Sequence, residues 1–156
     1  MKIIKYFFEF IFFISFFFIF KIIGYKNASN FGELIGKRIG PFFRSKIKTQ
    51  KNLDHLNIEN LENKSKENII ENMWGNYGRI LSEYVFLKKF RNNDLKEFLK
   101  IEGLEFLEEI KKNNEQVVFV SGHFNNFELM AMQIDKAGVD CAAIYRPLNN
   151  PYLNKI

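Results

Sequence analysis

The feature that most constrains this chain is an almost wholly apolar run near its amino terminus. Residues 6–20 read YFFEFIFFISFFFIF and are bounded by Lys5 and Lys21. As a helix this run extends for about 22 Å, and flanking isoleucines lengthen the apolar stretch to about 20 residues, the length that one membrane span requires. A cleavable signal peptide is the alternative, but no A-x-A-like cleavage site follows before Asn30. We therefore predict that residues 1–25 form an uncleaved membrane anchor.

Positive charge is unequal on the two sides of the apolar run. Lys2, Lys5 and the amino terminus precede it, whereas a longer series of basic residues follows it: Lys21, Lys26, Lys37, Arg38, Arg44, Lys46 and Lys48. Because basic flanks stay on the cytoplasmic side, we expect the body of the chain to face the cytoplasm. The net charge of +5 suits contact with anionic lipid. The sequence contains no run of basic residues long enough to indicate a nucleic-acid partner.

Residues 26–156 are interpreted as a single domain whose first half is helical. Residues 31–43 suit either a helix at the bilayer surface or the first helix of this domain. Between residues 65 and 90, apolar side chains recur at helical spacing in one stripe: Ile69, Ile70, Met73, Trp74, Tyr77, Leu81, Tyr84 and Val85. We interpret this stripe as a buried helix face, and Gly75 and Gly78 as positions of close packing. The single cysteine, Cys141, excludes an internal disulfide.

In the second half of the chain, the sequence pattern is typical of alternating strands and helices. We predict strands over 98–102, 116–121 and 140–145, and helices over 104–113 and 126–137. This order predicts an α/β fold, in which an N-terminal membrane helix is followed by further helices and a partial, mainly parallel βαβ sheet. A sheet with so few strands leaves hydrophobic edges uncovered. We therefore interpret residues 26–156 as an incomplete domain, the N-terminal portion of a longer one.

One turn of the predicted sheet carries a candidate acid–base pair. In VVFVSGHFNNFE, residues 117–128, His123 follows the predicted strand and Glu128 lies in the next helix. Residues five apart on a continuous helix do not face each other, so His123 must lie in the turn, with the chain folding Glu128 back to the imidazole. His123 is then a candidate general base that Glu128 orients. With no G-x-S-x-G nucleophile motif present, the pair indicates direct attack by a substrate hydroxyl or water.

Other interpretations of this turn stay open. The His123–Glu128 pair also suits a structural hydrogen bond. A metal site needs more ligands than this pair and His55, the other histidine, supply. Asn125 and Asn126 suit either a helix cap or amides that bind substrate.

Arg146 is a candidate anion-binding residue at the end of the last predicted strand. A guanidinium there can meet a phosphate or a phosphopantetheine arm. Because the carboxyl ends of parallel strands meet at one edge of a sheet, we expect Arg146 to lie near His123. A surface ion pair is the alternative interpretation.

Four features taken together resemble the bacterial lipid A biosynthesis acyltransferases, the lauroyl/myristoyl transferase family. They are, in chain order, the apolar anchor, MWGNYGRILSEY at 73–84, SGHFNNFE at 121–128 and YRPLNNP at 145–151. The resemblance covers most of the chain and is weakest before Ser65. Glycerolipid acyltransferases share the histidine-x4-acid motif but usually carry Asp, so Glu128 favours the lipid A family.

The resemblance implies transfer of a fatty acyl chain from acyl carrier protein to a hydroxyl of a lipid A precursor. It places this reaction at the cytoplasmic face of the cell inner membrane, in a glycerolipid-acyltransferase-like domain that uses no cofactor. His123 would deprotonate the acceptor hydroxyl and Glu128 would orient it, while Arg146, Asn125 and Asn126 would bind substrate. The family usually has Gly and Trp where this chain has Asn125 and Phe127, a departure that bears on acceptor preference.

Two alternative functions are compatible with the same residues. A glycerolipid acyltransferase performs the same chemistry on another acceptor. A non-catalytic, membrane-tethered remnant would use the His123–Glu128 pair structurally. Members of the family continue beyond this length and carry a further catalytic Arg and Asp there. Whether this portion is active alone therefore distinguishes an acyltransferase from a non-catalytic remnant.

Overall fold

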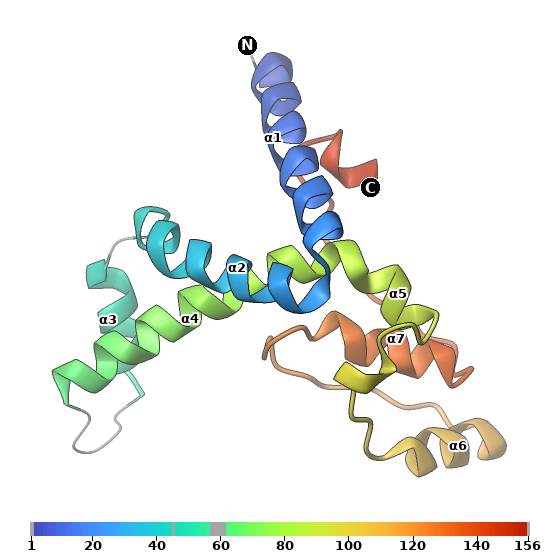
Figure 1. Cartoon of the computed structure of the whole chain (residues 1–156). Helices are drawn as coiled ribbons and strands as arrows, with labels where there is room; N and C mark the ends of the chain where they lie inside the picture. The colour runs from blue at the N-terminus through green and yellow to red at the C-terminus, as the bar shows by residue number, and fades with distance from the viewer. Residues whose placement is uncertain (1, 45, 57–61, 156) are drawn as a thin grey trace. The chain divides into compact units, whose positions relative to one another are not determined.

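The computed structural model describes residues 2–44, 46–56 and 62–155, which form helices joined by irregular segments (Figure 1). In chain order the helices are α1 (Lys2–Ile23), α2 (Tyr25–Ile39), α3 (Lys46–Asp54), α4 (Asn63–Glu83), α5 (Leu87–Arg91), α6 (Leu104–Asn113) and α7 (Glu128–Lys136). Short 3-10 turns cover Gly40–Phe42, Tyr84–Phe86, Lys96–Phe98 and Leu153–Lys155. The chain divides into two compact units, one of residues 20–85 and one of residues 1–19 with 86–156.

The predicted α/β fold with a parallel sheet is wrong. Among residues 2–44, 46–56 and 62–155 no strand forms, and no backbone hydrogen bonds join the segments 98–102, 116–121 and 140–145 to one another. A run of β-branched residues becomes a strand only when a neighbouring strand pairs with its backbone and its side chains are packed. Here Val118, Val120 and Ile144 are 89%, 90% and 106% exposed. The described fold is helical, with an apolar helix at its amino terminus.

Several predicted helices are confirmed. The helix predicted over 104–113 is α6, and α7 lies inside the helix predicted over 126–137. The helical pattern over 65–90 corresponds to α4, the turn Tyr84–Phe86 and α5. Asn114 follows α6 with a φ of 52°, and Gly138 follows α7 with a φ of 78°. Both residue types tolerate this left-handed conformation, which commonly ends a helix.

The helix α1 is long and apolar. Its 22 residues extend for about 33 Å, enough to cross the hydrocarbon core of a bilayer. Within the described part of the chain, it is the one helix with the length and composition of a membrane span. Phe20 is its buried residue, and large apolar side chains along the rest of its length are exposed. α1 is therefore a candidate membrane-contacting helix.

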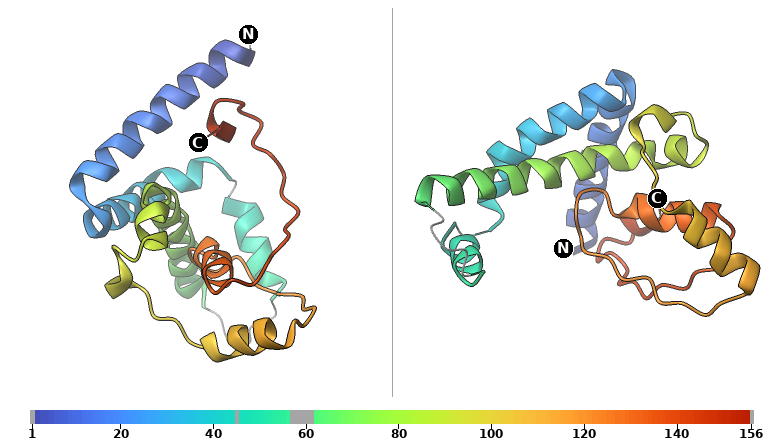
Figure 2. Two further views of the ribbon diagram at one scale, coloured as in Figure 1. Left: turned by 90° about the vertical axis from the view of Figure 1, so that its right-hand side faces the viewer. Right: turned by 90° about the horizontal axis from the view of Figure 1, so that it is seen from below.

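The helices α2 and α4 lie side by side in the unit of residues 20–85 (Figures 1 and 2). Their contact is built on glycine, because Gly32 and Gly36 of α2 face Gly78 of α4. A Cβ atom at Gly32 or at Gly78 would lie less than 3.0 Å from a backbone carbonyl oxygen of the other helix. The absence of a side chain at these positions allows the two backbones to approach closely, as predicted for Gly78.

The apolar stripe predicted as the buried face of residues 65–90 is buried only in part. Ile70 is 8% exposed, but Tyr77 and Leu81 are 57% and 42% exposed. The face toward α2 instead contains Gly78 and the fully buried Ser82. Small residues decide which face of α4 packs, because a large side chain there would hold the two backbones apart.

We predict that Gly78→Ala destabilises the protein. Alanine normally stabilises a helix by about 1 kcal/mol relative to glycine. At Gly78 the added Cβ meets the backbone of Gly32, and overpacking of this kind costs about 1–3 kcal/mol. Urea unfolding followed by circular dichroism measures the change. Asn72→Ala, at an exposed position of α4, is the matched control and should leave stability equal or higher. A Gly78→Ala protein more stable than the wild type would contradict the close contact.

Candidate functional site

His123 lies in the irregular segment that leads into α7, as expected from its place before a helix. Its side chain is exposed. The imidazole packs edge-on against the ring of Phe127, with ring centroids 4.4 Å apart and an angle of 73° between the planes. One face of the histidine is therefore held by an aromatic neighbour, while solvent, and hence a substrate, can reach the rest.

Asn125 and Asn126 form the turn between His123 and α7. Asn125 has a φ of 47°, and its carbonyl oxygen accepts a hydrogen bond from the Phe127 N–H at 3.1 Å. The Asn126 carbonyl oxygen accepts one from the Leu129 N–H at 3.1 Å. Phe127 occupies the N-cap position and no side chain caps α7. Of the two interpretations of these asparagines, the helix cap does not apply, because the N-cap residue is Phe127.

Glu128 is the first residue of α7 and is half-buried. A carboxylate in the first turn of a helix is stabilised by the exposed backbone N–H groups and the helix dipole. Its position at the helix start agrees with the prediction. The interaction described for the His123 imidazole is its ring contact with Phe127.

Arg146 lies in the irregular segment 139–148 and is exposed. The prediction placed it near His123 because both would end parallel strands at one sheet edge, and without a sheet that reason does not hold. No described hydrogen bond or ion pair links Arg146 to His123 or Glu128. Nor do the described residues contain a group of three His, Cys, Asp or Glu side chains that could hold a metal ion.

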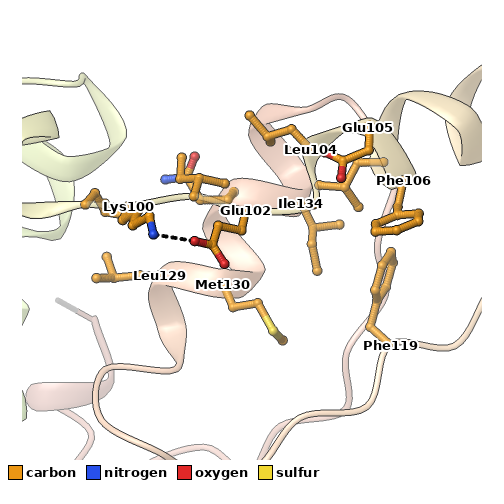
Figure 3. Close-up of a pocket in the computed structure, with 14 residues that line it drawn as sticks. Lys100, Glu102, Leu104, Glu105, Phe106, Phe119, Leu129, Met130 and Ile134 are labelled. Atoms are coloured by element: carbon orange, nitrogen blue, oxygen red, sulfur yellow. Dashed lines mark ion pairs between the residues drawn. The ribbon is translucent and has the colours of Figure 1, made fainter.

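An open apolar cavity of about 770 Å³ lies along α7 directly after Glu128 (Figure 3). From α7 its lining includes Leu129, Met130 and Ile134. From α6 and the segments around it come Phe106 and Phe119, whose rings lie next to each other in Figure 3. The remaining lining residues are Leu99, Lys100, Ile101, Glu102, Gly103, Leu104, Glu105, Leu107 and Gln133. The sequence motifs did not indicate this cavity, because its walls come from several separate segments.

A second cluster of polar side chains joins α2 and α4. The Ser29 Oγ donates a hydrogen bond to Glu83 Oε1 at 2.7 Å, and Arg79 Nη1 donates to Ser29 Oγ at 2.9 Å. Arg79 also forms an ion pair with Glu33, which Lys37 Nζ contacts at 2.9 Å. Ser29 and Glu83 are buried. Arg79 and Glu83 belong to MWGNYGRILSEY, so part of this motif serves to join two helices.

The polar cluster shifts the pKa of two of its members. Burial first, and then the neighbouring carboxylate of Glu83, raise the pKa of the Tyr25 hydroxyl to about 12. The hydrogen bond from Lys37, followed by the charge of Arg79, lowers the pKa of Glu33. Neither residue was among the predicted site residues. Glu83, the partner of Tyr25, and Arg79, one of the two partners of Glu33, lie on α4 and meet them only when α2 packs against α4.

The family model described as "Bacterial lipid A biosynthesis acyltransferase" matches residues 1–156 of the chain. The proteins that this description covers are acyltransferases, which act on a lipid A acceptor with an acyl donor. Because the match extends over the whole sequence, the chain belongs to the bacterial lipid A biosynthesis acyltransferase family. The family assignment predicted from the motifs is confirmed. Comparison with curated proteins and with solved structures gives no match.

We predict that Tyr25→Phe makes the protein less sensitive to alkaline pH. The folded state holds the Tyr25 proton up to a pKa of about 12, against an ordinary value of 10.0. Between these values the unfolded state releases the proton and the folded state keeps it, so stability falls as pH rises. Removing the hydroxyl removes this contribution.

Unfolding free energies measured across this pH window check the prediction. Tyr77→Phe, at a tyrosine that is 57% exposed, is the matched control and should retain the pH dependence of the wild type. The three proteins differ only at these two tyrosines, so the comparison isolates Tyr25. The same loss of stability in Tyr25→Phe and wild type would contradict the predicted coupling.

Proposed function

We propose that the protein transfers a fatty acyl chain from acyl carrier protein to a hydroxyl of a lipid A precursor. The observation that carries this proposal is the family match over residues 1–156. The apolar helix α1 supports a location at the membrane, where a lipid acceptor resides. The basic residues that follow α1 in the sequence suit the anionic cytoplasmic leaflet of the inner membrane.

In the proposed mechanism, His123 is the general base. Its imidazole takes the proton of the acceptor hydroxyl while the hydroxyl oxygen attacks the carbonyl carbon of the acyl thioester. Collapse of the resulting intermediate breaks the carbon–sulfur bond, and the departing carrier thiolate takes the proton back from the imidazolium. The exposure of His123 supports this role, because a base must reach the substrate. The product is an ester of the acceptor and a free carrier thiol.

Glu128 is proposed to orient the imidazole and to stabilise its positive charge. It lies in the first turn of α7, five residues after His123 in the sequence. Catalytic hydrogen bonds are often long or absent without substrate and form in the complex. The mechanism therefore requires a His123–Glu128 hydrogen bond when substrate is bound, in place of the imidazole's contact with Phe127.

The remaining predicted residues are proposed to bind substrate. Arg146 is exposed, and a guanidinium can form paired hydrogen bonds with a phosphate of the acceptor or of the donor arm. The Asn125 side chain is exposed at the turn beside His123, and we propose that it and Asn126 contact the acceptor.

The cavity along α7 is proposed to hold the acyl chain. Its volume of about 770 Å³ falls in the range of roughly 300–1,000 Å³ typical of small-molecule sites. Its walls include Leu129, Met130 and Ile134 on one side and Phe106 and Phe119 on the other. Because Leu129 follows Glu128 directly, a chain lying in this cavity has its path beside the start of α7, and the segment that carries the proposed base leads into this helix.

We predict that His123→Ala lowers kcat for acyl transfer by about 10²–10⁴-fold, the usual contribution of a general base, and that Glu128→Gln lowers it less. Transfer from a labelled acyl donor to lipid A precursor, measured with the membrane-bound protein, checks both. His55→Ala, which removes the other histidine at an exposed position, is the matched control and should be fully active. Unchanged transfer by His123→Ala would refute the role of His123. Transfer to lysophosphatidic acid in preference to lipid A precursor would favour the glycerolipid reaction.

We predict that Met130→Trp shifts the enzyme toward shorter acyl donors. The larger side chain fills part of the cavity, and steric exclusion of methylenes changes kcat/KM by about tenfold or more. The ratio of kcat/KM for a shorter and a longer acyl donor measures the shift. Ala131→Trp introduces the same side chain at an exposed neighbouring position that does not line the cavity, and it should leave the ratio unchanged. An unchanged ratio in Met130→Trp would place the acyl chain elsewhere.

A further inference from the structure

The side of α2 that faces away from α4 carries exposed apolar and basic residues. Gly32 and Gly36 define the side that meets α4. Leu34 follows Gly32 by two residues, which rotates it by about 200° to the opposite side. Phe31 and Arg38 lie three residues before and four residues after Leu34, so they share its side. Phe31 and Leu34 are 41% and 49% exposed, and Arg38 is also exposed. We call this side, with Phe31, Leu34 and Arg38, the open side of α2.

The turn that follows α2 exposes two large aromatic rings. Phe42 and Phe43 are 88% and 81% exposed, and the exposed Arg44 comes next. The backbone of this turn is held in place. The Phe43 N–H donates a hydrogen bond to the Gly40 carbonyl oxygen at 2.9 Å, and a Cβ atom at Gly40 would lie less than 3.0 Å from the Trp74 ring of α4. The two phenyl rings are therefore presented to the surroundings on a turn that packs against α4.

The sequence around this turn is positively charged. Residues 34–53 contain no Asp or Glu, and their basic residues are Lys37, Arg38, Arg44, Lys46, Lys48 and Lys51. The acidic residue of α2, Glu33, forms ion pairs with Lys37 at 2.9 Å and with Arg79 of α4, so its charge is met within the protein. A partner at this surface therefore meets net positive charge beside exposed phenyl rings, a combination that suits an anionic lipid surface.

The helix α2 begins where α1 ends. Gly24 alone lies between Ile23, the last residue of α1, and Tyr25, the first residue of α2. At this junction the ring of Phe20 lies edge-on to the ring of Phe31, with centroids 6.4 Å apart. With α1 anchored in the bilayer, as proposed above, α2 starts at the membrane surface. The open side of α2 starts there too, because Phe31 belongs to it.

We propose that the open side of α2 and the Phe42–Phe43 turn form a second membrane contact, on an anionic bilayer surface. The two phenylalanines enter the boundary between headgroups and acyl chains, and Arg38 and Arg44 bind lipid phosphates. In this arrangement α1 anchors the protein, and the second contact sets how the unit of residues 20–85 lies on the bilayer. A bilayer is favoured over an acidic protein partner because α2 begins at the anchor. The inference rests on the membrane location of α1 proposed above, and it is independent of the proposed reaction.

Spin labelling of the turn tests the second contact. Cys141→Ala removes the native thiol, and Phe43→Cys in this background carries a nitroxide, which is itself apolar, beside the unchanged Phe42. The full chain is reconstituted into vesicles of phosphatidylethanolamine and phosphatidylglycerol. Collision of the label with oxygen, which dissolves in lipid, is compared with its collision with a water-soluble nickel chelate present on both sides of the bilayer. A turn in the lipid boundary predicts an oxygen-to-nickel ratio several-fold higher than that of a label in water.

Two further label positions make this result decisive. Ile69→Cys is the matched control in water, because Ile69 is 40% exposed and lies nine residues from Gly78, half a revolution of α4 away from the side that meets α2. Equal ratios at positions 43 and 69 would overturn the proposal. Phe18→Cys, at an exposed position of α1, reports on the anchor. Lipid contact at 18 with water contact at 43 would overturn the second contact alone, whereas water contact at both would also remove the membrane location of α1.

Removing charge tests the role of the arginines. Arg38→Gln together with Arg44→Gln should lower the oxygen-to-nickel ratio at position 43 several-fold, and replacing phosphatidylglycerol by phosphatidylcholine should do the same, because each change removes the attraction to anionic headgroups. Lys64→Gln, at an exposed lysine of α4, is the matched control and should leave the ratio unchanged. A ratio that responds to neither change would overturn the anionic contact. Nickel collision that is frequent in vesicles and falls only when acyl carrier protein is added would identify a protein-docking surface instead.

Discussion

The close approach of α2 and α4 is the constraint on which the unit of residues 20–85 depends. Gly32 and Gly78 leave no room for a side chain between the two backbones. The short distance between the two helices brings the polar side chains beside these glycines within hydrogen-bonding distance of each other. Ser29 meets Glu83 at 2.7 Å because the helices lie so close together. Buried polar groups are costly unless they are hydrogen-bonded, so the glycine contact and the polar cluster depend on each other.

This mutual dependence gives a physical meaning to MWGNYGRILSEY. Its glycine at position 78 allows the approach, its Arg79 forms an ion pair with Glu33, and its Glu83 accepts the hydrogen bond of Ser29. The motif that supports membership of the lipid A acyltransferase family therefore builds the scaffold. The reacting groups that we propose lie in the other motif, SGHFNNFE, in the unit of residues 1–19 and 86–156.

Helices were predictable from the sequence because their hydrogen bonds are local. The helix predicted over 104–113 is α6, and its pattern of apolar residues needs no distant partner. The predicted strands failed because a strand requires pairing with another segment, which valine-rich composition alone does not supply. The turn at His123 and the start of α7 near Glu128 were predictable, since both depend on residues adjacent in the sequence.

The contacts between distant residues were beyond prediction from sequence patterns. Asn150 and Glu9 are 141 positions apart, and neither the apolar run nor the YRPLNNP motif indicates that they meet. The same holds for the cavity along α7, whose walls come from several segments. The placement of Arg146 near His123 was expected because both would end strands of one sheet. Without the sheet, there is no reason to expect it.

The most direct test of the proposed chemistry follows the label of an acyl donor carried by acyl carrier protein. The membrane-bound protein is incubated with this donor, with and without lipid A precursor, and the lipid and protein fractions are separated. Direct attack by the acceptor hydroxyl, assisted by His123, predicts label in the lipid when the precursor is present and none bound covalently to the protein. Label that stays on the donor would indicate a non-catalytic protein, and label on the protein would contradict direct transfer.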